Sequence, residues 1–180
     1  PAAEYKVTHK STDIHKNFDA DETAFTNISI AGRLMTRRIM GKASFGVMKD
    51  SFGEIQLYFN RDEICEGEDK SLYNDVFKKM LDLGDFIGVK GSVFRTQTGE
   101  ISVNVKEFSM LSKSLRPLPT VKTDADGKVH DAFSDPELRY RQRYVDLIVN
   151  DSVKAIFTKR SKTMNSMRRV FDDAGYMEVE

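Results

Sequence analysis

The chain has 180 residues, of which 39% are hydrophobic and 10% aromatic, so it can bury a core and is not a disordered polypeptide. Lysine plus arginine and aspartate plus glutamate both total 28, and this balance excludes a protein that coats nucleic acid through bulk charge, while leaving room for a local basic site. The single cysteine, Cys65, excludes an internal disulfide and a cysteine-based zinc site, and it favours a reducing, cytoplasmic location.

Residues 1–26 are polar and lack a clear periodicity, which predicts a tail or a short leading helix. They contain no charged-then-apolar signal segment, and we find no apolar run in the chain that is long enough to span a membrane. The chain opens on Pro1 without an initiating methionine, and it closes on the alternating run 176–180. We interpret both ends as cut, the second one inside a strand.

From Asn27 onwards, apolar and polar residues alternate in a way that predicts a barrel domain over residues 27–116. Gly32 interrupts the first run, where a strand is expected to bend sharply, and Gly84 is placed to end a helix. The predicted order of strands and one helix is that of an OB-fold, a five-stranded barrel that binds oligonucleotides or oligosaccharides. The predicted strands cover residues 27–34, 44–49, 54–60, 86–96 and 101–111, and the predicted helix covers residues 71–83.

The rest of the chain predicts a linker followed by helices. Residues 117–133 are polar and follow a proline-rich break, which is typical of a linker or a long loop. Ser134 is the expected cap of a first helix, with Pro136 in its first turn. A second helix over residues 152–174 ends at Gly175 and carries a continuous apolar face, which needs a partner surface.

The segment Gly41-Lys42-Ala43-Ser44 shares residue types with a nucleotide phosphate loop but lacks its context. Such a loop needs an earlier glycine and a helix directly after it, whereas a strand follows here. The three histidines, His9, His15 and His130, lie in the leading segment and the linker, and no nucleophile is paired with a base. The sequence therefore predicts no catalytic residue and no metal site.

Four basic residues cluster in and after the first strand: Arg33, Arg37, Arg38 and Lys42. On a barrel surface they can contact phosphates without reading a base sequence. We treat Arg37, Arg38 and Lys42 as the candidates for phosphate contacts.

Three further residues are candidates for base contacts. Phe45 can stack on a single-stranded base, an interaction worth about 1–3 kcal/mol per base. Gln56 can read a base edge because its amide both donates and accepts, and Glu107 continues the row of Val103 and Val105, where a carboxylate could accept from a base. Each residue also has a plain structural interpretation: Phe45 as core, Gln56 as a solvated sheet residue, Glu107 as the mark of a bulge or strand end.

Several segments closely resemble bacterial lysyl-tRNA synthetases, and the resemblance covers residues 27–180. The aspartyl and asparaginyl enzymes share the barrel and a similar R-Y-x-D-L signature, but TRRIMGKASF followed by RYRQRYVDLI resembles the lysine branch. The segments that carry the resemblance are AGRLMTRRIMGKASF (31–45), GEIQLYF (53–59), LGDFIGVKG (83–91), TGEIS (98–102), LRPLP (115–119) and ELRYRQRYVDLIVND (137–151).

This resemblance implies a mainly β chain with added helices: an anticodon-binding OB-fold and then, over 134–180, the first helices of a class II α/β catalytic domain. By the family pattern, Phe45 resembles the ring that stacks on the central anticodon uridine. Gln56 and Glu107 resemble the polar groups that read this base, and Arg33 resembles an anticodon-contacting arginine. The implied partner is the anticodon stem-loop of tRNA-Lys.

Full-length relatives join lysine to ATP with Mg²⁺ and then charge tRNA-Lys. They are homodimers built through motif 1, which the helix 152–174 and the run 176–180 resemble. Motifs 2 and 3 are absent from the chain, so we expect it to be inactive alone and to hold no cofactor.

Three alternatives remain open on sequence grounds. A fragment of an aspartyl- or asparaginyl-type synthetase would prefer a different anticodon. A generic single-strand-binding OB module would tolerate base changes, and its salt dependence would follow its few basic contacts. An interaction module acting through the helix 151–174 would dimerise without RNA.

Overall fold

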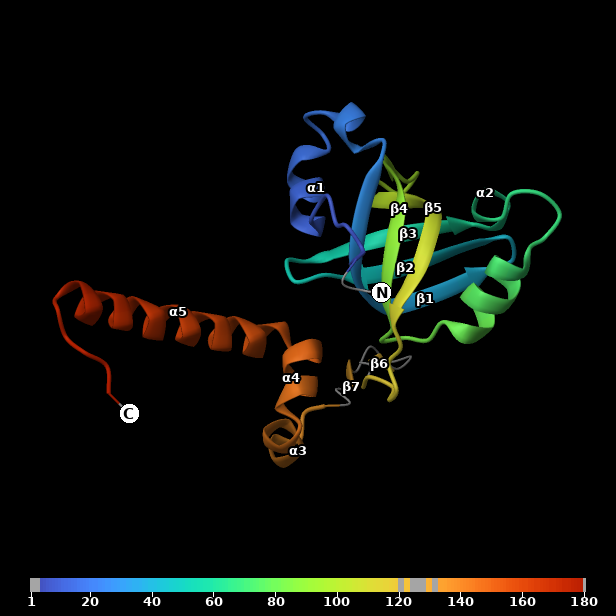
Figure 1. The fold of residues 1–180 in the computed structure, drawn as a ribbon. Coiled ribbons are helices and arrows are strands. Elements are labelled where there is room, and N and C mark those ends of the chain that lie inside the picture. The colour runs from blue at the N-terminus through green and yellow to red at the C-terminus, as the bar shows by residue number, and fades with distance from the viewer. Residues whose placement is uncertain (1–3, 120–121, 124–128, 131–132, 180) are drawn as a thin grey trace. The chain divides into compact units, whose positions relative to one another are not determined.

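In a computed structural model, the structure describes residues 4–119, 122–123, 129–130 and 133–179 (Figure 1). The chain divides into two compact units, residues 1–117 and 118–180. Within the described part of the chain, no helix is both long enough and apolar enough to cross a membrane.

The first unit is a closed five-stranded barrel, as the sequence predicted, with strands hydrogen-bonded in the order β1-β2-β3-β5-β4. All neighbouring strands are antiparallel except β3 and β5, which run parallel. This is the OB-fold. The strands are β1 (Ile28–Met40), β2 (Ala43–Lys49), β3 (Glu54–Asn60), β4 (Phe86–Arg95) and β5 (Ile101–Ser112).

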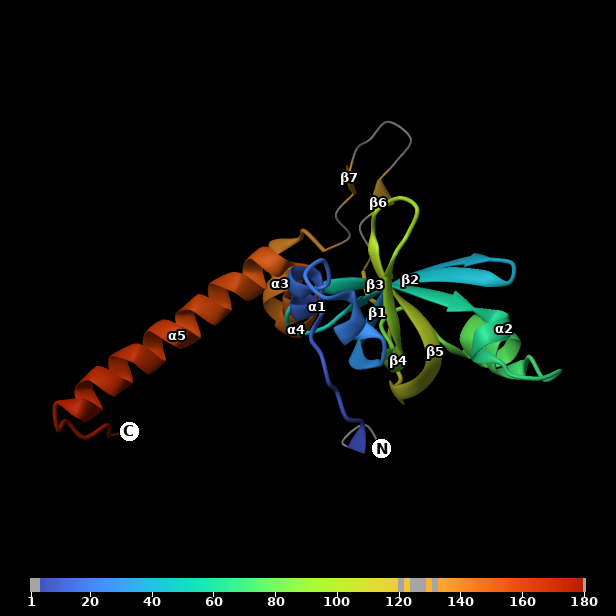
Figure 2. The same ribbon diagram turned by 90° about the horizontal axis from the view of Figure 1, so that it is seen from above.

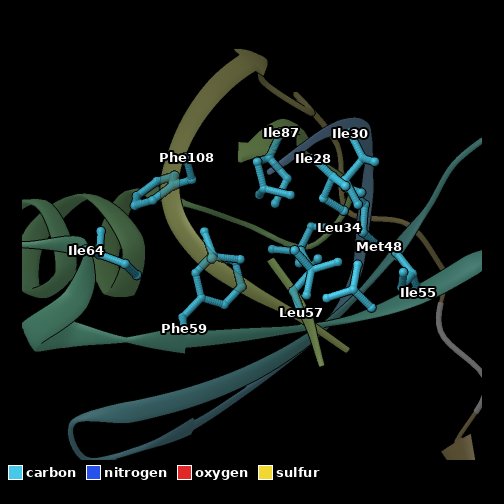
Figure 3. Close-up of a cluster of buried hydrophobic side chains, with 14 of the residues drawn as sticks. Ile28, Ile30, Leu34, Met48, Ile55, Leu57, Phe59, Ile64, Ile87 and Phe108 are labelled. Atoms are coloured by element: carbon cyan, nitrogen blue, oxygen red, sulfur yellow. The ribbon is translucent and has the colours of Figure 1, made fainter. Parts of the chain in front are cut away.

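The barrel interior is filled by apolar side chains that alternate along every strand. Figure 3 shows side chains from several strands converging on one cluster, in which Leu34, Leu57 and Phe59 are fully buried. Residues between them point outward, because successive side chains of a strand face opposite sides of the sheet. The interior positions thus fix which residues reach the outer face.

A bulge in β1 changes this alternation. The pairing of β1 with β2 shifts between Leu34 and Thr36, which leaves Met35 as the extra residue. Before the bulge Leu34 points into the core, whereas after it Arg37 points inward and Arg38 points outward. The strand also continues to Met40, beyond Leu34, the last residue of the alternation on which the prediction rested.

A second bulge lies in β5. Lys90 of β4 pairs with Glu107, but the next residue, Gly91, pairs with Val105, so Lys106 is the extra residue. As a result Phe108 is buried, while Glu107 is exposed. The expectation that Glu107 continues the inward row of Val105 is therefore wrong, and the alternative that it marks a bulge describes the strand correctly.

The leading segment forms α1 (Ser11–Asn17) and the short 3₁₀ helix η2 (Glu22–Phe25). Ile14 and Phe18 are buried in the barrel core cluster. Ser11 donates from its N and its Oγ to the Asp50 carboxylate, each at 2.8 Å, which ties α1 to the β2–β3 turn. Figures 1 and 2 both show α1 and α2 on opposite sides of the barrel.

Between β3 and β4 lie α2 (Arg61–Ile64) and η3 (Leu72–Met80). The helix expected over residues 71–83 is shorter than predicted and is a π-helix, closed for example by Leu81 N donating to Val76 O at 3.0 Å. Residues four apart lie almost above one another in this wide coil. Accordingly, the buried rings of Tyr73 and Phe77 stack with centroids 5.2 Å apart.

The described part of the second unit holds three helices: α3 (Pro136–Arg141), α4 (Arg143–Val149) and α5 (Asp151–Asp173). The first predicted helix breaks at Gln142, and its cap is Asp135, which accepts from Leu138 N at 2.8 Å, not the predicted Ser134. Within the predicted linker, residues 122–123 pair with 129–130 as strands β6 and β7.

A buried carboxylate joins the three helices of the second unit. Asp146 is fully buried and accepts hydrogen bonds from Arg139 Nε at 3.0 Å, from Arg143, and from Asn150 Nδ2 at 2.7 Å. Burial acts to raise the pKa of Asp146, but these hydrogen bonds and the two guanidinium charges outweigh it and hold the pKa below its usual value. The aspartate of the R-Y-x-D-L signature thus has a structural role, because its hydrogen bonds connect the helices of this unit.

Helix α5 ends as predicted at Gly175, whose φ of 81° is a conformation that glycine adopts without strain. Gly175 N donates to Asp172 O and Tyr176 N donates to Phe171 O, the two bonds of a Schellman motif. Residues 176–179 do not form the predicted strand, since no described segment pairs with them.

The fold makes a testable prediction about Asp85, a fully buried carboxylate before β4. Burial acts to raise its pKa, but donation from Asp82 N, Lys113 Nζ and Ser114 N outweighs it, so the pKa lies below its usual value. Asp85→Asn should lower the unfolding free energy at pH 7 by about 2 kcal/mol, because these three donors lose a charged acceptor.

The pH dependence follows from the direction of this shift. The carboxylate contributes its stabilisation fully above its unfolded pKa of about 3.9, and loses it as the pH falls through the lower folded value. Urea unfolding of wild type and variant should therefore show a constant difference from pH 7 to about pH 5 that narrows below about pH 4. A difference that widens in acid would contradict this account.

Candidate nucleic-acid interface

The outer face of the barrel carries a groove of about 670 Å³. Cross-strand partners on one face of a sheet lie side by side, so the pairing register explains which residues meet there. Arg38 of β1, Phe45 of β2 and Tyr58 of β3 are successive partners in one row. The groove is lined by Thr36, Arg38, Met40, Phe45, Gly46, Val47, Gln56, Tyr58, Phe94, Thr96, Gln97 and Thr98.

Three aromatic rings form a continuous row along this groove. The centroids of Phe45 and Tyr58 are 5.1 Å apart, and those of Tyr58 and Phe94 are 5.8 Å apart. Phe45 is half-buried, so it is not a core residue, and its ring is free to contact a ligand. Such a row is a stacking platform for flat, unpaired bases.

Gln56 adds an oriented amide to this platform. It faces the groove on β3, between the buried Ile55 and Leu57, as the alternation of the sequence predicted. Its Oε1 accepts a hydrogen bond of 2.6 Å from the Ser102 hydroxyl. The side chain is therefore held in place and is not a freely solvated sheet residue.

Two of the predicted phosphate contacts, Arg38 and Lys42, are exposed at the β1–β2 hairpin. Gly41, with φ of 67°, and Lys42 form its two-residue turn, which fits the preference for glycine at the first position of such turns. The glycine-lysine pair thus belongs to a β-hairpin and not to a phosphate loop. Arg38 lines the groove beside Phe45.

Arg37, the third predicted phosphate contact, points to the other side of the sheet. Its guanidinium donates to Leu81 O at 2.6 Å and also to Phe77 O, two carbonyls at the end of η3. It also lies 5.8 Å from the centroid of the Phe77 ring. Arg37 therefore holds the end of the π-helix through these hydrogen bonds and does not line the groove.

Arg33 and Glu107, two of the four predicted anticodon contacts, also lie outside the groove. Arg33 donates to Gly84 O at 2.7 Å and lies over the Phe86 ring at 4.2 Å. Partial burial lowers the pKa of its guanidinium from the usual value. Glu107 forms an exposed ion pair of 2.7 Å with Lys90. The structure thus brings Phe45 and Gln56 together, but not Arg33 and Glu107.

Sequence reasoning missed the β4–β5 turn as a wall of the groove. Thr96, Gln97 and Thr98 line it, and the turn is closed by Gly99 N donating to Thr96 O at 2.9 Å. The signal was available, since the sequence shows a turn of polar residues ending in glycine. What the sequence lacks is the barrel closure that brings this turn beside β2 and β3.

The groove contains groups that stack and donate hydrogen bonds, but no catalytic arrangement. Within the described ranges, no group of three or more His, Cys, Asp or Glu side chains could hold a metal ion. The chemistry that this site can perform is recognition of a flat, polar, anionic ligand.

Residues 28–111 match the family described as OB-fold nucleic acid binding domain, and residues 135–180 match class II tRNA synthetases (D, K and N). The chain is 59% identical over its full length to the lysine–tRNA ligase of Christiangramia forsetii and 60% identical to that of Porphyromonas gingivalis. The corresponding enzyme of Azobacteroides pseudotrichonymphae is 57% identical. The chain is related to lysine–tRNA ligases along its whole length.

The chain spans about a third of these lysine–tRNA ligases: 31% of the first two and 36% of the third. The two family matches divide it in the same order as the structure does, barrel first and helical unit second. The groove therefore lies in the part of the chain that matches the family described as OB-fold nucleic acid binding domain.

The placement of Arg37 and Lys42 leads to a prediction for binding to a single-stranded RNA loop. Arg37→Met should lower the unfolding free energy by about 1–3 kcal/mol, because carbonyls at the end of η3 lose their donor. It should leave the slope of log Kobs against log salt unchanged. Lys42→Met should change stability by less than about 0.5 kcal/mol but reduce the slope by about 0.7, the value for one phosphate contact on a single strand.

Urea unfolding and fluorescence anisotropy at several salt concentrations measure both quantities. If Arg37→Met reduces the slope of log Kobs against log salt and leaves the unfolding free energy unchanged, Arg37 contacts a phosphate and the structural role assigned to it is wrong.

Proposed function

We propose that the barrel binds the anticodon loop of tRNA-Lys and that Phe45, Gln56 and Arg38 contact its bases and backbone. The observation that carries this proposal is the row of three rings beside one fixed amide and an exposed arginine. The similarity to lysine–tRNA ligases supports tRNA-Lys as the source of the loop.

The rings supply binding energy that tolerates different bases. Phe45 lies at the open edge of the row, while Tyr58 is flanked by Phe45 on one side and Phe94 on the other. A base stacked on Phe45 would have its polar edge directed along the sheet toward Gln56, in the next cross-strand row. Stacking of this kind contributes about 1–3 kcal/mol per base.

The polar groups add orientation and selectivity. The Gln56 amide can donate from Nε2 to a base carbonyl, and uracil presents carbonyls at positions 2 and 4. Arg38 and Lys42, on the hairpin beside Phe45, can contact the phosphates of the same loop. This arrangement favours a single-stranded loop containing uridine over a duplex, because stacking on Phe45 needs an unpaired base.

For the whole protein, we propose the activity of its relatives: activation of lysine with ATP and Mg²⁺, followed by transfer to tRNA-Lys in the cytoplasm. We assign ATP and Mg²⁺ to the whole protein. We also propose a homodimer formed through α5. Its apolar side chains Ile156, Met167 and Val170 are at least half exposed.

A binding measurement tests the proposed RNA recognition. Wild-type protein should bind a tRNA-Lys anticodon stem-loop in fluorescence anisotropy, and Phe45→Ala should weaken binding by about 1–3 kcal/mol through loss of stacking. Phe52→Ala is the matched control, since Phe52 is an exposed ring on the β2–β3 turn outside the groove. Equal binding by both variants would contradict the assigned site.

The base preference distinguishes this function from a generic single-strand binder. A generic OB module should bind the loop equally well after its central uridine is replaced by cytidine. The proposed function requires weaker binding after this replacement.

The proposed dimer gives a separate prediction. At micromolar concentration, sedimentation velocity should show the dimer, and Val170→Lys should shift it to monomer because a charge enters the apolar contact. Thr158→Lys, which places the same charge at an exposed position on the opposite face of the helix, is the control. A dimer that persists in Val170→Lys would exclude this face of α5.

A further inference from the structure

The hydroxyl group of Ser102 is fully buried directly beneath the groove and makes one described hydrogen bond, to Gln56. Ser102 lies on β5 between its cross-strand partners Gln56 of β3 and Phe94 of β4. Its Oγ donates to Gln56 Oε1 at 2.6 Å. Ser102 therefore has no surface of its own to offer a ligand.

This hydrogen bond favours one of the two possible orientations of the Gln56 side-chain amide. An amide presents an acceptor at one end and donors at the other, and the two ends have nearly the same shape. A hydroxyl can also accept from an amide, but Ser102 is fully buried and its O–H has no other acceptor among the described residues, so a reversed Gln56 amide would leave this donor unpaired. The favoured orientation therefore holds Oε1 against β5 and leaves Nε2 for a ligand. Within the described residues, no group accepts a hydrogen bond from Gln56 Nε2.

A held amide distinguishes two pyrimidines that stack equally well. Uracil presents a donor at N3 and an acceptor at position 4, so it can donate to the second lone pair of Oε1 and accept from Nε2. Cytosine presents the reverse pattern, an acceptor at N3 and an amino donor at position 4. In the same pose both of its contacts face a group of the same kind, which leaves buried polar groups unpaired.

We propose that Ser102 is a specificity-determining residue that makes the groove prefer uracil to cytosine by fixing the orientation of the Gln56 amide. This inference rests on the proposed function, since it concerns the base held on Phe45. Ser102 acts through Gln56 and is a positioning residue. Without its hydroxyl, a half-turn of the amide exchanges donor and acceptor and makes the groove complementary to cytosine.

The test compares two anticodon stem-loops that differ only in a central uridine or cytidine. Wild-type protein should bind the uridine loop at least about tenfold more tightly, as expected for one discriminating bidentate pair. Ser102→Ala should reduce this ratio to about threefold or less, chiefly by tighter binding of the cytidine loop. A residue that only supports the fold would weaken both loops together and leave the ratio unchanged.

Three further variants complete the experiment. Ser102→Thr keeps the hydroxyl and should keep the wild-type ratio, whereas Ser102→Cys has almost the shape of serine but is a weak donor and should behave as Ser102→Ala. Ser92→Ala, on the neighbouring strand β4 and outside the groove lining, should leave the ratio unchanged. Circular dichroism establishes that each variant is folded.

The outcomes separate this inference from the proposed function. If wild-type protein binds neither loop, or binds both equally, the proposed function fails. If wild-type protein prefers the uridine loop and both Ser102→Ala and Ser102→Cys keep the full ratio, the proposed function stands and the role of Ser102 is overturned.

Discussion

The alternation of side chains along the strands of a closed barrel is the constraint on which the rest of this structure depends. One set of residues must fill the interior, so the remaining set forms the outer face, and a shift of one residue exchanges the two. The bulges at Met35 and Lys106 introduce such shifts. Because of the first, Arg38 lies beside Phe45 in the groove while Arg37 points inward. Because of the second, Phe108 fills the interior and Glu107 is left on the surface.

Several of the polar groups that the fold buries are matched with partners, and the pairs beneath the groove hold its surface in place. Arg37 supplies donors to the end of η3, and the hydroxyls of Tyr73 and Ser44 lie 2.7 Å apart, so the π-helix is attached to the underside of the hairpin that carries Phe45. Asp146 performs the corresponding role among the helices of the second unit. Buried charges of this kind are tolerated when each has good hydrogen-bond geometry. The strands that carry the groove are thus supported by hydrogen bonds on the opposite side of the sheet.

Local patterns were sufficient to predict the barrel, its strand order, the helix end at Gly175 and the outward direction of Gln56, because these depend on alternation and on turn residues. The bulge at Met35 could not be predicted, since it is defined by the partner strand and changes no local residue pattern. The bulge beside Glu107 was one of the interpretations of that residue, because a carboxylate is out of place in an apolar row. The assignments of Arg33, Arg37 and Glu107 extended one alternation through a bulge or relied on family resemblance alone, and the structure places these side chains elsewhere. The π-helix and the break at Gln142 likewise depend on tertiary hydrogen bonds that a helical periodicity does not show.

The central claim is that an anticodon base lies on the row Phe45–Tyr58–Phe94 with its edge toward Gln56. The most direct test is photo-crosslinking with a tRNA-Lys anticodon stem-loop that carries 4-thiouridine at its central position, followed by mass spectrometry of the crosslinked peptide. We expect crosslinks to residues 43–49 and 54–60, which form β2 and β3. Crosslinks confined to the peptides that contain Arg33 or Glu107 would contradict this claim. They would place the bound base outside the groove, at the surface near Arg33 or Glu107.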